Sequence, residues 1–167
     1  MAIADYLKER TVVLKVKDLF FDIDAFSYSL SQMGSEVGRQ NDTVATETES
    51  EFGRRTLRRC MEQRVALLRQ TLKKCLKDAD DEAQKTDVLG TADSFTFVFQ
   101  VSTETQDSVF EPVKDLMHEY VVKGTLKDWY DYLGLSGGDR LAPRLTEVET
   151  RMKKLLYHRA LPAVTRN

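Results

Sequence analysis

The sequence is poor in cysteine and histidine, with two of each among 167 residues. Cys60 and Cys75 stand 15 residues apart in one segment of helical periodicity, which corresponds to about 22 Å along an α-helix. A disulfide needs Cα atoms within roughly 7 Å, so both thiols are expected to be reduced and buried. With only His118 and His158 in the chain, no spacing typical of a zinc site occurs.

Long apolar runs are absent as well. None approaches the ~18–20 residues of a membrane span, and the N-terminus from Met1 to Arg10 carries Asp5 and Glu9 without an apolar signal core. We therefore expect no membrane contact, no secretion and a cytoplasmic location in the producing cell. The length predicts a single domain over residues 1–167. A chain of this size buries roughly two-thirds of its unfolded surface without a metal or disulfide.

Apolar residues recur at helical spacing in both halves of the chain. In the N-terminal half, one helix is predicted from Asp18, as its N-cap, through Met33, with Gly34 ending it. A longer helix is predicted from Phe52 to Ala79, since no proline interrupts its stripe. That stripe consists of Leu57, Met61, Val65, Leu68, Leu72 and Leu76.

Two capping boxes predict helix starts in the C-terminal half. The first, Ser108–Glu111, opens a helix that either kinks at Gly124 or restarts with Thr125 as a cap. The second, Thr146–Glu149, opens a last helix that ends at Pro162.

Two short segments are typical of strands. Residues 11–17 are rich in β-branched side chains, and residues 94–101 place three phenylalanines on alternating positions. They are expected to pair as a small ribbon; alternatively, residues 94–101 lay their phenylalanines over a helical core without pairing. Residues 34–50 are predicted to form a mobile acidic loop and residues 163–167 a frayed C-terminus. The expected fold is mainly α, an antiparallel helical bundle of about four helices with one or two short peripheral strands.

No catalytic signature is present. A di-iron bundle needs Glu-x-x-His from two helices, and Asp115–His118 is the only approximation. The loop over residues 134–143 has three glycines before Arg140 but lacks the phosphate-loop pattern. Ser136 stands in a match to G-x-S-x-G over residues 134–138, but no strand is predicted before this loop, as a nucleophile elbow requires. We expect no enzymatic activity, no cofactor and no bound metal.

Charge is distributed in blocks of opposite sign. Residues 51–77 carry a net +7, residues 18–50 a net −6 and residues 140–167 a net +5. The basic block is explained in three ways: a solvated helix face neutralised by the chain's own acidic segments, a surface for protein partners or self-association, or a nucleic-acid-binding face. Of the two functional explanations, protein contact is favoured, because no DNA-reading motif accompanies the arginines.

Two adjacent arginine pairs form the candidate partner-binding site: Arg54, Arg55, Arg58 and Arg59. Helical spacing brings at least three of these guanidiniums together. The acidic stretch Asp42–Glu51 is a candidate counter-surface, either within the chain or from another subunit.

Two segments carry a resemblance to a known class of proteins. Residues 113–133 read VKDLMHEYVVKGTLKDWYDYL, and residues 152–162 read MKKLLYHRALP. The combination resembles small helical proteins encoded among the virion structural genes of phages and prophages in gut bacteria. It is carried by residues 118–122, 128–130 and 155–159. The resemblance implies a non-enzymatic component of a head–tail junction or tail, acting as an oligomer or ring and located in the virion. No functional residue transfers, because the matching positions are core-like.

Overall fold

The computed structural model describes residues 6–31, 51–77 and 92–157. These residues form four α-helices and a two-stranded antiparallel sheet. The expectations for residues 34–50, for Pro162 and for residues 163–167 lie outside the described residues, as does the helix end at Gly34. The elements, in chain order, are β1 (Leu7–Lys15), α1 (Val16–Ser31), α3 (Glu51–Thr71), β2 (Ser94–Ser102), α5 (Phe110–Tyr132) and α6 (Ala142–Tyr157), with short 3-10 helices at Asp107–Val109 and Ser136–Leu141.

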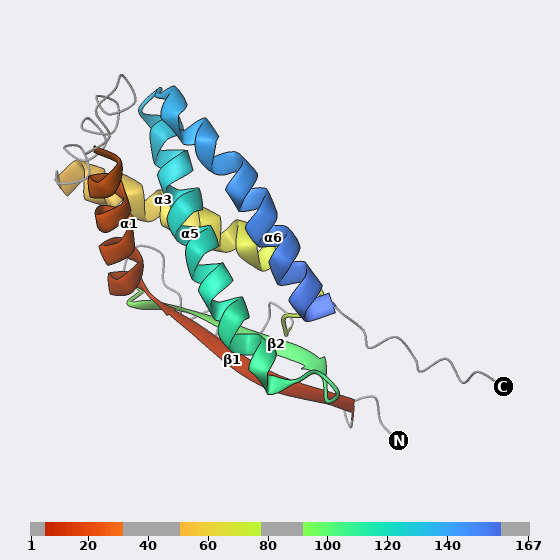
Figure 1. The fold of residues 1–167 in the computed structure, drawn as a ribbon. Helices are drawn as coiled ribbons and strands as arrows, with labels where there is room; N and C mark the ends of the chain where they lie inside the picture. The colour runs from red at the N-terminus through yellow and green to blue at the C-terminus, as the bar shows by residue number, and fades with distance from the viewer. Residues whose placement is uncertain (1–5, 32–50, 78–91, 158–167) are drawn as a thin grey trace.

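Helix α5 is the centre of the molecule. It contacts α1, α3, α6 and β1, and α6 runs beside it in the opposite direction while α3 crosses behind it (Figure 1). The sheet closes the end of the molecule where α5 begins. Because α5 has neighbours on several sides, its apolar residues do not form a single stripe. It is one continuous helix of 23 residues that passes through Gly124, so no second helix starts at Thr125.

The sheet confirms the predicted ribbon, but its first strand is Leu7–Lys15 rather than residues 11–17, whose last two residues belong to α1. β1 and β2 pair antiparallel from Leu7 opposite Ser102 to Lys15 opposite Ser94. Alternation places one face of each strand against the helices. The buried strand side chains are Val12, Leu14, Phe95, Phe97, Phe99 and Val101. The phenylalanines therefore belong to a paired strand and also cover the helical core. The two predicted arrangements are thus combined in one structure.

The second predicted helix ends earlier than Ala79. α3 stops at Thr71, and the chain then turns toward the sheet. There the Lys77 N–H donates to the Val98 carbonyl over 2.9 Å, and the Gln100 N–H donates to the Cys75 carbonyl over 2.7 Å. Leu76 continues the helical spacing in sequence but is bridged to Phe99. Pairing with the open edge of β2 replaces the last helical turns, because it satisfies the same backbone groups.

The predicted helix starts are also displaced. α1 begins at Val16, so Asp18 lies in its first turn rather than at the N-cap, where a carboxylate still favours the helix dipole. The residue preceding α5 is Val109, which makes no side-chain capping bond, so the capping box at Ser108 does not form.

The last helix starts before its predicted capping box. α6 begins at Ala142, inside the segment expected to be a loop, and Pro143 fits its first turn because no N–H is needed there. Thr146 therefore lies within α6, and its Oγ1 donates to the Ala142 carbonyl over 3.2 Å.

Candidate interaction groove between two helices

Three of the four candidate arginines lie together on one surface groove. Arg54, Arg55 and Arg58 from α3 face Lys17 from α1 across an open groove of about 560 Å³. Arg59 is exposed on α3 and is not among the residues that line the groove. The helical spacing therefore brings three guanidiniums together, as expected. The pair Arg58 and Arg59 is split, because Arg58 lines the groove and Arg59 does not.

The α1 side of the groove is one helical face. It is formed by Lys17, Phe20, Phe21 and Asp24. The last three residues follow Lys17 by three, four and seven positions, which places all four on the same face of the helix. These residues were not identified as a site from the sequence. The spacing alone could have grouped them, but nothing in the sequence indicates that this face lies beside the arginines of α3.

Arg54 joins the two helices. Its guanidinium donates two hydrogen bonds to the Asp24 carboxylate, at 3.0 and 2.7 Å. The same group lies 5.0 Å from the centre of the Phe20 ring, a geometry in which the ring face attracts the cation. Bidentate pairing and stacking together hold Arg54 in one orientation, so it forms a wall of the groove.

The other two groove arginines have acidic neighbours on their own helix. Arg55 donates to Glu51 over 2.6 Å, and Glu51 is the one described member of the stretch proposed as a counter-surface. Arg58 donates to Glu62 over 3.4 Å and also to the carbonyl of Ala92. The Arg55 side chain is 77% exposed, whereas Arg58 is largely covered. Arg55 is thus the most accessible cation of the three.

Two large aromatic side chains are exposed on the helices that form the groove. Phe21 lines the groove and is 73% exposed, and Phe52, one turn before Arg55 on α3, is 65% exposed. Phe20 beside it is half-buried and packs against the core. The groove therefore combines accessible aromatic surface with fixed cations.

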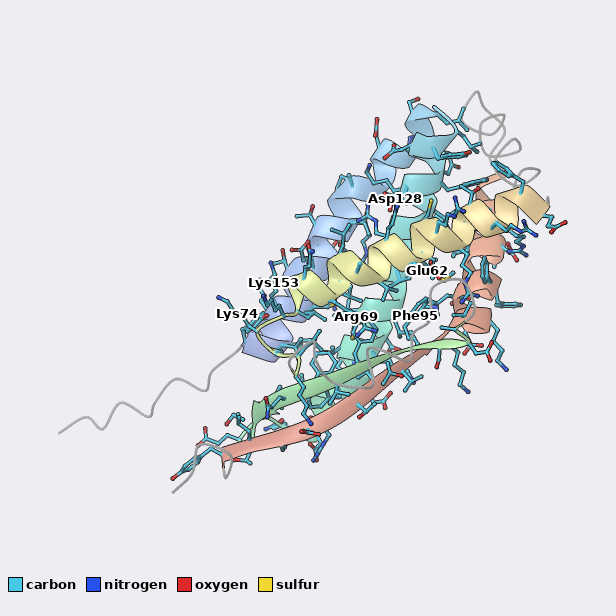
Figure 2. The ribbon with its side chains drawn as sticks, turned by 180° about the vertical axis from the view of Figure 1, so that it is seen from behind. Glu62, Arg69, Lys74, Phe95, Asp128 and Lys153 are labelled. Atoms are coloured by element: carbon cyan, nitrogen blue, oxygen red, sulfur yellow. The ribbon has the colours of Figure 1, made fainter. Side chains whose placement is uncertain are left out.

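Much of the remaining positive charge on residues 51–77 is held by contacts within the chain. Arg64 donates two hydrogen bonds to Asp128, at 2.7 and 2.8 Å, and Lys77 lies 2.9 Å from Glu9. Arg69 points from α3 toward β2 (Figure 2), donates to the Thr96 carbonyl over 2.9 Å and lies over the Phe97 ring. Arg64 and Arg69 connect α3 to α5 and β2, and Lys77 connects the segment after α3 to β1, so the net +7 of the sequence overstates the positive charge offered to a partner.

The groups with catalytic potential lie elsewhere and are engaged in packing. Cys60 and Cys75 are free and buried, as expected, and burial raises the pKa of Cys60 to about 11, which keeps that thiol protonated at neutral pH. His118 Nε2 lies 2.5 Å from Asp22 Oδ2 and connects α5 to α1. Within the described parts of the chain, no group of three or more His, Cys, Asp and Glu side chains is placed to hold a metal ion.

Fold and groove together define a mainly helical protein with a mixed-charge, aromatic surface groove between α1 and α3. No protein-family model, curated protein or solved structure matches the chain. Among the described helices, none is long and apolar enough to cross a membrane.

Proposed function

We propose that the protein is a non-enzymatic assembly protein that acts through protein–protein contacts, as a component of a phage or prophage head–tail junction or tail. It associates with copies of itself, as an oligomer or ring, or docks onto a larger complex. In this proposal the four helices act as an antiparallel bundle that presents α1 and α3 to the partner. The protein is made in the cytoplasm and becomes part of the virion.

The observation that carries this proposal is the groove between α1 and α3. Protein interfaces are enriched in aromatic residues and arginine, and the groove supplies Phe21 beside Arg54 and Arg55. Asp24 and Phe20 already hold Arg54 in place. Binding a partner therefore costs little further side-chain entropy at Arg54. Large exposed aromatics on an ordered surface are typical of interaction sites.

The alternative is a nucleic-acid-binding role for the basic face Arg54–Lys77. It is favoured by one observation: Arg59, Lys73 and Lys74 are exposed on the same helix and the turn after it. Phosphate contacts would make binding fall steeply with salt, with a log–log slope of about −0.9 per phosphate.

Charge reversal separates the two functions. Arg55→Glu with Arg59→Glu changes the groove end of α3, and Lys73→Glu with Lys74→Glu changes the charge equally at the opposite end (Figure 2). Sedimentation of the purified full chain, alone and with duplex DNA, gives the masses of the complexes. We expect an oligomer that the first variant dissociates and the second leaves intact, and no DNA complex. A monomeric chain that binds DNA, with binding lost in both variants, would favour the alternative.

A further inference from the structure

We propose that the groove between α1 and α3 binds an acidic segment of a protein partner that carries at least one aromatic or large aliphatic side chain. This inference rests on the proposed function and specifies the chemistry of the partner. It is drawn from the charge, the exposed aromatic ring and the fixed geometry of the groove.

The charge of the groove selects an anionic partner. Its lining contains four cations, Lys17, Arg54, Arg55 and Arg58, and one carboxylate, Asp24, which amounts to a net +3. The Asp24 carboxylate accepts hydrogen bonds from both terminal nitrogens of Arg54. Its charge is thereby partly neutralised, so it repels an incoming carboxylate less than an unpaired carboxylate would. Lys17 on α1 and Arg55 on α3 are exposed cations on opposite walls, and Arg55 is engaged only in a solvent-exposed pair with Glu51. An acidic segment between them meets a cation on each side.

The aromatic surface selects an apolar side chain within that segment. Phe21 is the most exposed large apolar residue of the described chain, and it lies in the groove lining. The Phe20 ring next to it is covered by the Arg54 guanidinium at 5.0 Å. A single apolar side chain placed against Phe21 would remove its ring from water, and this contact would determine where along the groove the acidic segment sits.

The same features favour a peptide over a nucleic acid. Binding of single strands uses successive exposed rings on which bases stack along a continuous basic track. Among the residues that line the groove, Phe21 has the one open ring, because Arg54 covers Phe20; Phe52 is exposed on α3 but is not part of the lining. The track is also interrupted, since Glu51 and Glu62 stand beside Arg55 and Arg58 on α3. Carboxylates alternating with arginines match the mixed polarity of a protein surface.

The test uses a defined probe on the intact chain. A fluorescent twelve-residue peptide containing six glutamates and two tryptophans is titrated with the full-length protein, and anisotropy reports binding. The same peptide with every glutamate replaced by glutamine tests charge, and a single-stranded oligonucleotide of equal charge tests the nucleic-acid explanation. The variants are Phe21→Ser and Arg55→Glu, both at exposed positions where we expect folding to be unaffected. The controls are Leu67→Ser and Lys74→Glu, exposed positions on α3 and the turn that follows it.

We expect the acidic peptide to bind, and each groove variant to weaken binding about tenfold while both controls leave it unchanged. Three results would overturn the inference: no binding of the peptide, an equal loss with Lys74→Glu, or tighter binding of the oligonucleotide. A dimer of the unliganded chain that Phe21→Ser dissociates would also overturn it, by making a second copy the occupant. If assembly depends on Arg55 and Arg59 but the acidic peptide does not bind, the proposed function stands and this inference fails.

Discussion

Gly124 leaves space for an arginine at the crossing of α3 and α5. A Cβ atom at this position would lie 2.4 Å from Arg64 Cδ and 2.7 Å from its Nε. Arg64 cannot easily move, because Asp128 accepts two of its hydrogen bonds and the Tyr120 ring lies 5.8 Å beneath its guanidinium. The glycine is thus required by packing rather than by backbone conformation, and the helix continues through it without interruption.

Replacing this glycine therefore tests the crossing. Gly124→Ala should lower the free energy of unfolding by about 1–3 kcal/mol, because the added methyl group overpacks a fixed contact. Urea denaturation measures the change. In an Arg64→Ala background the same substitution should instead stabilise the protein by about 0.5–1 kcal/mol, since alanine is then the better helix residue. An equal loss in both backgrounds would show that Arg64 does not cause the effect.

Leu72 tests the apolar stripe predicted from the sequence. It is fully buried together with Leu68, Met61 and Trp129 in the core. Leu72→Ala should lower the free energy of unfolding by about 2–5 kcal/mol, as for other buried leucines. Leu67→Ala, at a side chain that is 44% exposed, provides the comparison, with an expected change within about 0.5 kcal/mol. An unfolding midpoint that does not move for Leu72→Ala would place this residue outside the core.

Between elements, ion pairs connect α5 to its neighbours. Arg144 from α6 donates to the two carboxylate oxygens of Glu119, at 2.6 and 3.0 Å, and Lys123 donates to the same carboxylate over 2.7 Å. The Arg144 hydrogen bonds, followed by those of Lys123, lower the pKa of Glu119 from 4.5 to about 2 although partial burial opposes the shift. Glu119 is thus ionised in the folded protein at a pH where the unfolded chain binds a proton.

This difference makes stability depend on pH in a defined direction. The folded-state pKa is below the unfolded value, so the stabilisation is present above about pH 4.5 and is lost as the pH falls toward 2. Glu119→Gln should lower stability at neutral pH and reduce the acid-induced loss in that window. Denaturation curves recorded from pH 7 to pH 2 measure both effects. Unchanged acid sensitivity would mean that the pair with Arg144 contributes nothing.

A second carboxylate titrates in the same range and needs a control. Arg10 and Lys8 on β1 lower the pKa of Asp107 to about 2, through hydrogen bonds to its carboxylate. Asp107→Asn should remove a separate part of the acid response, and the effects of the two single variants should add because the sites share no partner.

At the scale of the whole molecule, one helix connects the other elements. α5 contacts α1, α3, α6 and the sheet, and the core formed around it is continuous. We expect one cooperative unfolding transition for the chain, as for other small single domains. Scanning calorimetry compares the calorimetric and van't Hoff enthalpies, which should agree. Two separate transitions would contradict a single domain over residues 1–167.

Part of this architecture could be predicted from residue periodicity. The stripe from Leu57 to Leu76 predicted α3, and the alternating phenylalanines predicted β2, because the spacing of apolar residues follows directly from the geometry of each element. The ends were wrong where tertiary contacts decide them. Residues 75–77 leave the helix to bond with β2, and the capping boxes at Ser108 and Thr146 are not used.

The sequence by itself determined a mainly helical chain, many of its core residues and a basic segment in which at least three arginines cluster. Only the tertiary structure decided which acidic partners those arginines meet and which of them remain accessible. Asp24 and Phe20 lie 30 or more positions from Arg54 in the chain, yet they hold its guanidinium and build the groove beside Phe21. The physical reason is the distance along the chain over which each signal operates. Apolar periodicity reflects neighbours three or four residues apart, whereas charge pairing and burial depend on which surfaces folding brings together.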